Sequence, residues 1–168
     1  MKRRLILLRH AKSDWKAGAP TDQARPINAR GRRDSPRVAV RIAELGWIPT
    51  HIWSSDATRT RETVELMLPR FKPAPKVSYE SKLYLGDLRA MRKVMGGVSD
   101  KCKTAMLVGH NPGWEEAASL LTGLSINMTT CNAILLTVKA DSWSDALAME
   151  SAWKLNEHIL PRALKKKK

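Results

Sequence analysis

Two short, continuous apolar runs constrain the fold of this chain more than any other feature. Residues 5–8 read LILL, and TAMLVGH at 104–110 is apolar until it reaches its final Gly-His pair. A strand that is apolar at every position, rather than at alternate positions, is typical of a strand buried on both faces. We therefore expect these two runs to form adjacent, central strands with helices packed on either side.

Helical and strand patterns alternate along the rest of the chain. Helical spacing of apolar residues, together with Pro and Gly at helix boundaries, predicts helices at 31–46, 57–68, 85–97 and 112–123. Strands are predicted at 4–8, 51–55, 76–79, 104–110 and 133–140, with a last antiparallel edge strand at 146–155 and a loop at 18–26. This alternation predicts an α/β fold, a three-layer α/β/α sandwich around a mostly parallel central sheet.

Length and composition limit the class of protein. A chain of 168 residues is long enough for one core, and we expect a single domain over 1–160 followed by a disordered basic tail at 161–168. No apolar run has the length of a membrane-spanning helix, so we expect no membrane contact and a cytoplasmic protein. Cys102 and Cys131 lack the spacing of metal ligands and are expected to be reduced thiols.

The formal net charge of +14 suits a negatively charged partner, such as nucleic acid or a phosphorylated substrate. The basic residues are scattered, four of them in Lys165–Lys168, and they do not alternate with aromatic residues as in a single-strand binder. We therefore expect a phosphorylated protein or small molecule as partner, and no nucleic acid. A basic anion- or nucleic-acid-binding module without catalysis is the alternative from another class.

Polar residues with catalytic potential follow three of the predicted strands directly. Arg9 and His10 come after the first strand, and His110 ends the second apolar run. The serine pair at 54–55 ends another strand, with Arg59 one turn further on. Ligands of open α/β sheets bind in the crevice outside the carboxyl ends of the strands. We therefore expect these residues to converge on one site.

Two histidines and two arginines at one site favour phosphate chemistry. Arginine grips phosphate oxygens in a bidentate manner, and a neutral imidazole is a competent nucleophile toward phosphorus. A zinc site would need a third ligand, which the sequence does not offer at a convincing position, and the arginines would repel a dication. We therefore predict no metal and no cofactor.

Three motifs, LLRHAKSDW, SSDATRTRET and VGHNPG, resemble in this order the signatures of the histidine phosphatase superfamily, the phosphoglycerate-mutase-like proteins. Over roughly residues 3–138 the chain more closely resembles the short, SixA-type phosphohistidine phosphatases. The resemblance implies a phosphoglycerate-mutase-like fold and a phospho-enzyme mechanism. In that mechanism His10 is the nucleophile, and Arg9, Arg59 and His110 form the phosphate pocket. Ala11 replaces the glycine of the usual RHG, a small change that leaves the pocket intact.

The same motifs predict further site residues, each with an alternative role. Ser13 lies where related enzymes bring a hydroxyl to the phosphate, or it caps the loop. Arg25 lies in a stretch that resembles R-P-L-x-x-x-G. It either reaches into the site from the loop or has a structural role at the start of the following helix. Asn111 touches substrate or shapes the turn before the helix. For the pocket arginine we prefer Arg59 to its neighbour Arg61.

No glutamate acid of the kind that many members of this superfamily carry is evident between Arg59 and His110. Glu80 and Asp87 are the acidic candidates in that interval, and neither has a typical context. A leaving group that is easy to expel, such as the imidazole of phosphohistidine, tolerates a missing acid better than an alkoxide does. We therefore expect a metal-independent phosphohydrolase that favours a protein phosphohistidine, with a small phosphometabolite as the alternative substrate. The sequence leaves the oligomeric state open.

Overall fold

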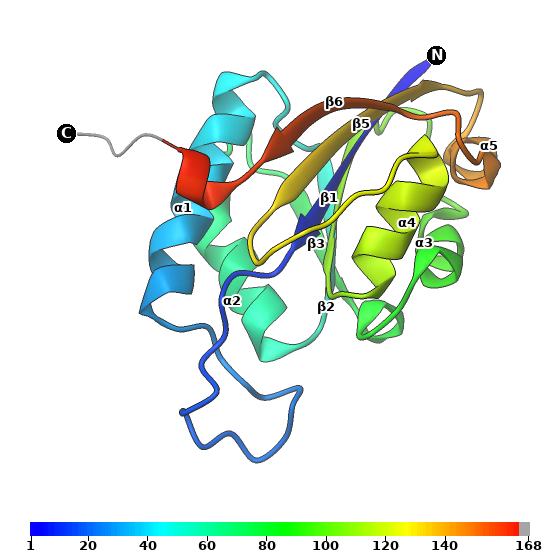
Figure 1. The fold of residues 1–168 in the computed structure, drawn as a ribbon. Helices are drawn as coiled ribbons and strands as arrows, with labels where there is room; N and C mark the ends of the chain where they lie inside the picture. The colour runs from blue at the N-terminus through cyan, green and yellow to red at the C-terminus, as the bar shows by residue number, and fades with distance from the viewer. Residues whose placement is uncertain (165–168) are drawn as a thin grey trace.

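The computed structural model describes residues 1–164 as a six-stranded sheet between two layers of helices (Figure 1). The strands are β1 (Lys2–Arg9), β2 (His51–Ser55), β3 (Lys76–Glu80), β4 (Thr104–Gly109), β5 (Ala133–Lys139) and β6 (Lys154–Ile159). The helices are α1 (Ala29–Glu44), α2 (Thr58–Met67), α3 (Leu88–Met95), α4 (Gly113–Thr122) and α5 (Trp143–Ala148), with 3-10 turns η1 (Leu68–Arg70), η2 (Ser81–Leu83) and η3 (Pro161–Ala163). None of the helices in this range combines the length and apolar character needed to cross a membrane.

The sheet has the strand order β3-β2-β4-β1-β5-β6. The four strands from β3 to β1 are parallel, whereas β5 is antiparallel to both β1 and β6. The predicted three-layer α/β sandwich is therefore confirmed. The sheet itself is mixed, with its parallel part on one side and its antiparallel part on the other.

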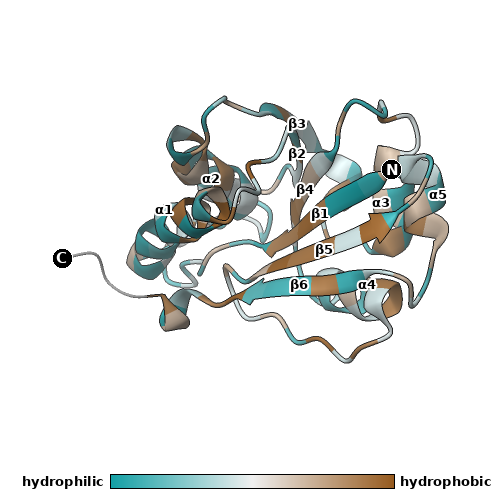
Figure 2. Cartoon of the chain, turned by 90° about the horizontal axis from the view of Figure 1, so that it is seen from above, coloured by the Kyte–Doolittle hydropathy of each residue, from teal (hydrophilic) through white to brown (hydrophobic). Residues whose placement is uncertain are grey.

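The burial of β1 explains its continuous apolar sequence. Leu5 and Leu7 pack into the core under α3, α4 and α5, whereas Ile6 and Leu8 pack into the core under α1 and α2. All four side chains are fully buried. Figure 2 shows apolar stretches of β1 and β5 between the two helical layers, with a largely hydrophilic outer side on α1. Because β4 pairs directly with β1 and is also buried, the prediction of two adjacent central strands is confirmed.

The region after β5 differs from the prediction. The sequence predicts a strand at 146–155, but α5 occupies the first part of this stretch and the antiparallel edge strand β6 begins only at Lys154. Trp143 and Leu147 of α5 are buried in the core shared with α3 and α4, a packing that the local pattern does not reveal. The other predicted helices and strands end within three residues of the observed bounds.

Residues 161–164 also differ from the prediction. Pro161 is buried at the start of η3, and the carbonyl of Leu164 accepts a hydrogen bond from Arg37 of α1 at 2.7 Å. The prediction of a disordered tail is therefore wrong for these four residues. The remainder of the predicted tail, Lys165–Lys168, lies outside the described residues.

A close backbone approach joins the start of α4 to the segment after η2. The hydrogen of Gly113 faces the carbonyl oxygen of Gly86, and a side chain at Gly113 would overlap that oxygen. Gly86 comes two residues after Tyr84, and Gly113 three residues after His110. The contact therefore brings these two side chains together, and their rings meet edge-on with centroids 5.4 Å apart.

We predict that Gly113→Ala lowers the free energy of unfolding by about 1–3 kcal/mol or more, because the added methyl group must displace backbone. Gly97→Ala is the matched control, since a Cβ at Gly97 would meet no atom within 4 Å. Urea denaturation of both variants and the wild type measures the difference. Equal unfolding midpoints for the two variants would contradict the close approach.

Candidate active site

The carboxyl ends of β1, β2 and β4 bring the predicted catalytic residues together. Arg9 at the end of β1 pairs with Gly109 at the end of β4, so His10 and His110 follow neighbouring strand ends. Their rings lie with centroids 5.3 Å apart. Ser55 ends β2 beside them, and its Oγ is 2.8 Å from Nε2 of His110. The structure thus gathers residues that the sequence places at three separate strand ends.

His10 is held in the tautomer that a nucleophile needs. Its Nδ1 lies 2.7 Å from the carbonyl oxygen of Ala11. Because a carbonyl only accepts, Nδ1 carries the ring proton and Nε2 keeps its lone pair. The amide of Ala11 donates to Oγ1 of Thr63 at 3.0 Å, and this hydroxyl donates to the carbonyl of Arg59 at 2.7 Å. Thr63 therefore connects the segment of His10 to α2.

His110 offers a hydrogen-bond donor to the site. The amide of Ala57 donates to Oγ of Ser55 at 3.2 Å, and the Ser55 hydroxyl has no other acceptor among the described residues, so we assign its proton to Nε2 of His110. The ring proton of His110 then resides on Nδ1, which is buried and has no hydrogen-bond partner within residues 1–164. Buried polar groups are nearly always satisfied, so an unpaired one marks a place for an acceptor.

Burial keeps both histidines neutral. Loss of water around the ring, together with the charges of Arg59 and Arg9, lowers the pKa of His10 to about 3. Burial also lowers the pKa of His110 to about 3, with His10 and Arg59 adding to the effect. Because the ordinary value is about 6.5, both rings are uncharged at neutral pH. His10 therefore has its lone pair available without help from a base.

We predict that the His10 and His110 rings stay in the neutral form from neutral pH down to about pH 5, because a lowered pKa moves the charged form to more acidic conditions. NMR titration of the ring signals measures this, with His10→Ala and His110→Ala used to assign them. Signals that hardly shift over this range are the expected result. A titration midpoint near the ordinary value of about 6.5 for either ring would contradict its burial in the neutral form.

Arg9 and Arg59 supply two further donors. Nη1 of Arg9 donates to the carbonyl of Met128 at 2.9 Å, while its Nε is buried without a partner. Arg59 is 3% exposed and contacts Asp22 through both terminal nitrogens, and its Nε is likewise buried without a partner. With Nδ1 of His110, three buried nitrogens near His10 lack an acceptor among the described residues. This combination of charge and unpaired donors suits an anion such as phosphate.

Arg61, the competitor of Arg59, points away from the histidines. It is exposed, its guanidinium carbon lies 4.1 Å from the ring centroid of Tyr79, and its Nε donates to the carbonyl of Asp56 at 2.9 Å. Of these two arginines, Arg59 is therefore the one that lies near the histidines, and its contact with substrate stays a prediction.

Three other predicted residues surround this pocket. Ser13 is buried and its Oγ accepts from Nε of Arg25 at 3.0 Å. Arg25 also pairs with Asp22, and its guanidinium carbon lies 3.6 Å from the ring centroid of Trp15. Asn111 donates to a backbone carbonyl before β5 at 2.8 Å, and its Oδ1 is buried without a described partner. A contact of Ser13, Arg25 or Asn111 with substrate stays a prediction.

The two acidic candidates have different surroundings. Asp87 is the N-cap of α3, where its carboxylate accepts from the amides of Arg89 and Ala90 at 3.0 and 3.4 Å. Glu80 ends the edge strand β3, beside Ser55 of β2. Within residues 1–164, no three His, Cys, Asp or Glu side chains gather as a metal site requires.

The structure adds two residues that the sequence did not single out, Asp22 and Tyr84. Asp22 comes from the loop between β1 and α1, and its carboxylate contacts Arg25, Arg59 and the hydroxyl of Tyr84. The hydrogen bond from Tyr84 and the two arginines hold the pKa of Asp22 well below its ordinary range. The same bond raises the pKa of Tyr84. The signal that the sequence offered for Asp22 was its position three residues before Arg25, with which it forms an ion pair.

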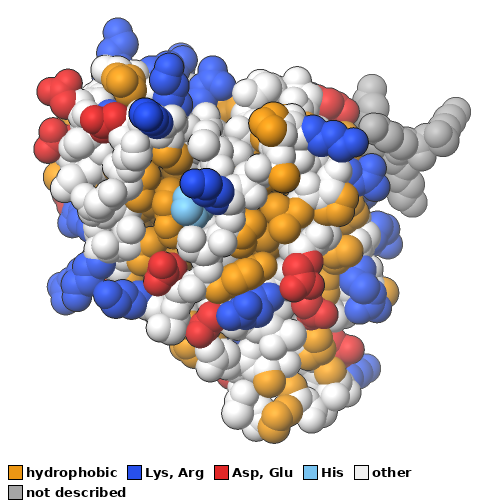
Figure 3. Space-filling model, turned by 180° about the vertical axis from the view of Figure 1, so that it is seen from behind, with side chains coloured by type: hydrophobic (Ala, Val, Ile, Leu, Met, Phe, Trp, Pro, Cys, Tyr) orange, Lys and Arg blue, Asp and Glu red, His pale blue; other side chains and the backbone are white. Residues whose placement is uncertain are grey.

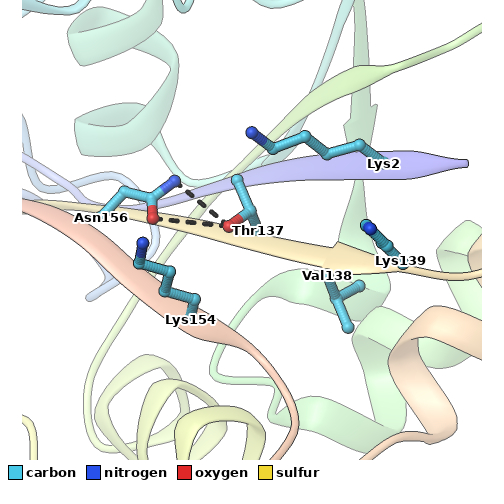
Figure 4. A pocket seen from close by; sticks show the side chains of 6 residues that line it. All are labelled: Lys2, Thr137, Val138, Lys139, Lys154 and Asn156. Atoms are coloured by element: carbon cyan, nitrogen blue, oxygen red, sulfur yellow. Dashed lines mark hydrogen bonds between the residues drawn. The ribbon is translucent and has the colours of Figure 1, made fainter.

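Other basic residues lie away from this site. A hollow of about 420 Å³ on the sheet is lined by Lys2, Thr137, Val138, Lys139, Lys154 and Asn156 (Figure 4). Lys2 stands at the opposite end of β1 from Arg9. On the face shown in Figure 3, Lys and Arg side chains are spread around the molecule rather than gathered in one patch.

Some of the basic residues have a structural role, because the buried carboxylate of Asp34 forms ion pairs with three arginines of α1.

Comparison with known proteins identifies the family. The family model of the histidine phosphatase superfamily (branch 1) matches residues 5–84. A chloroplastic protein of Arabidopsis thaliana, named as uncharacterized, is 38% identical over 96% of this chain and 79% of its own length. An uncharacterized protein of Mycobacterium leprae is 34% identical over 71% of this chain and 74% of its own. This chain belongs to the histidine phosphatase superfamily.

Solved structures of phosphatases share the fold. A candidate phosphohistidine phosphatase SixA from Agrobacterium tumefaciens matches with a TM-score of 0.79 and 25% identity, over 95% of this chain and 98% of that one. The histidine phosphatase SixA complexed with tungstate gives 0.78 at 16% identity, over 96% and 99%. A mycobacterial glucosyl-3-phosphoglycerate phosphatase gives 0.66 at 17% identity, over 93% and 98%. As a member of this superfamily, the chain is a phosphatase.

Proposed function

We propose that this phosphatase hydrolyses phosphohistidine on a protein, through a phosphoryl group carried on His10 and without a metal ion. The observation that carries the proposal is the arrangement around His10. Its Nε2 is unprotonated, and three buried donors near it lack an acceptor among the described residues. Donors that are in place before the substrate arrives stabilise the charge on the phosphoryl oxygens in the transition state.

The reaction has two steps at the same phosphorus atom. In the first, Nε2 of His10 attacks phosphorus, a nitrogen–phosphorus bond forms, and the leaving group departs with the electrons of its own bond to phosphorus. In the second, water attacks phosphorus, the bond to His10 breaks, and Nε2 regains its lone pair. The attacking water passes one proton to a phosphoryl oxygen or to solvent as inorganic phosphate forms. Arg9, Arg59 and His110 hold the oxygens throughout.

The protonation states around the pocket favour a leaving group that needs no acid. The contacts of Asp22 lower its pKa and the pKa of Tyr84 is raised, so neither group releases a proton at neutral pH. Asp87 is engaged at the start of α3. Phosphohistidine can take a proton on its other ring nitrogen and leave as neutral imidazole. An alkyl phosphate, in contrast, would have to expel an alkoxide.

Exposed apolar side chains near the pocket support a protein as the substrate. Trp15 is 72% exposed and covers Arg25, and Leu85, directly after Tyr84, is 61% exposed. Large exposed side chains of this kind are enriched at surfaces that contact other proteins. The likeness to a phosphatase of a sugar phosphate supports the alternative of a small phosphometabolite.

We predict that rapid quenching with radiolabelled p-nitrophenyl phosphate traps label on the denatured chain. A phosphohistidine is stable to base and labile to acid, so label should survive alkaline separation and vanish after acid treatment. His10→Ala should carry none, whereas His51→Ala, altered at the far end of β2, should keep it. A chelator should not change turnover. Label on His10→Ala would place the phosphoryl group on another residue. Full turnover of His10→Ala, or turnover abolished by the chelator, would favour a metal-activated water instead.

We predict that kcat/KM for a protein phosphorylated on histidine exceeds that for the same protein phosphorylated on serine by about 10²-fold or more. General acid catalysis is worth about 10²–10⁴-fold, and only the serine substrate needs it. Steady-state phosphate release from both substrates, with a sugar phosphate and phosphoglycerate alongside, measures the difference. A higher kcat/KM for either small molecule would contradict the protein substrate and favour the alternative.

A further inference from the structure

Asp22 connects three segments around the candidate pocket. Its Oδ2 accepts from Nη2 of Arg59 at 3.0 Å and from the hydroxyl of Tyr84, and its Oδ1 accepts from Nη1 of Arg25. Its backbone carbonyl accepts from Nη1 of Arg59 at 2.7 Å. The partners belong to α2, to the segment after η2 and to the loop itself. One residue therefore contacts two cations and one hydroxyl of the site.

The contacts of Asp22 leave the inner nitrogens of the pocket free. Arg59 reaches Asp22 through its two terminal nitrogens, whereas its buried Nε has no partner within the described chain. Arg25 uses Nη1 for Asp22 and Nε for Ser13. Nε of Arg9 is also buried and unpaired. An anion held by the free nitrogens can therefore bind while Asp22 keeps its place.

We propose that Asp22 is a positioning residue that fixes Arg59 and Arg25 in the orientation required to hold the phosphoryl group. The inference rests on the phosphate pocket proposed above. A free arginine side chain samples many rotamers and loses this freedom when it binds substrate. Charge-assisted hydrogen bonds to a fixed carboxylate remove much of that loss in advance. Small errors in the placement of such groups are sufficient to slow a reaction strongly.

The exposure of Asp22 makes the proposal testable by chemical rescue. Its side chain is 45% exposed, whereas that of Arg59 is 3% exposed. Removal of the carboxylate therefore leaves a space that solvent reaches, beside an arginine that is otherwise buried. A small carboxylate such as formate can enter this space and accept the same hydrogen bonds. In the wild type the space is filled, so formate can only compete with phosphate.

Formate is expected to affect the activity of Asp22→Ala and of the wild type in opposite directions. Asp22→Ala should lower kcat/KM for p-nitrophenyl phosphate by about 10- to 100-fold, in line with misplaced catalytic groups. Formate should raise the activity of Asp22→Ala severalfold while it leaves the wild type unchanged or inhibited. Asp14→Ala is the matched control in the same loop, because the Asp14 carboxylate accepts from the amide of Lys16 and contacts none of the pocket arginines. It should keep wild-type kcat/KM.

Equilibrium binding of inorganic phosphate separates this proposal from the proposed function. Asp22→Ala should bind phosphate more weakly than the wild type, even if no phospho-enzyme can be trapped on His10. That outcome would retain the role of Asp22 and remove the covalent mechanism. Asp22→Asn keeps the size of the side chain and one acceptor oxygen, so it should lose less phosphate affinity than Asp22→Ala. This variant also controls for a loss of folding. Wild-type turnover in Asp22→Ala, or inhibition of that variant by formate, overturns the proposal.

Discussion

The parallel pairing of β1 with β4 is the constraint on which the site depends. Both strands are buried on both faces, so their register is fixed by two cores at once. A slip of one residue would move Leu7 from the core under α4 to the core under α1, and every neighbour with it. Because the register holds, Arg9 lies opposite Gly109, and the histidines that follow emerge side by side.

The same burial that stabilises the sheet also prepares the chemistry. Two imidazole rings and three arginines share one region, and an imidazolium there would lack water and face other cations. This is why the pKa of His10 and that of His110 are lowered by burial and by the neighbouring arginines. His10, the proposed nucleophile, is therefore kept neutral by its burial and by the same arginine charges that would attract phosphate. Asp22 supplies one compensating negative charge at the edge, where it stays in contact with solvent.

The sequence by itself determined the centre of the sheet and the strand ends at which the candidate site residues lie together. Continuous apolar runs identify strands buried on both faces, because a strand with one exposed face alternates between apolar and polar residues. Each candidate ends or directly follows such a strand, or lies in the first turn of the next helix, so its position is set by local structure. This is why Arg9, His10, Arg59 and His110 could be predicted from short motifs. The apolar spacing of the helices gave their bounds for the same reason.

Only the tertiary structure decided the residues that depend on contacts between distant segments. Asp22 meets Arg59 and Tyr84 across 37 and 62 positions of the sequence, through a loop with no regular pattern. The antiparallel direction of β5 and the helix α5 likewise follow from packing against elements far along the chain. Trp143 is buried there because it packs into the same hydrophobic core as the apolar residues of α3. The periodicity of a sequence indicates which face of a helix or strand is apolar. Which residues pack against that face is decided only when the chain folds.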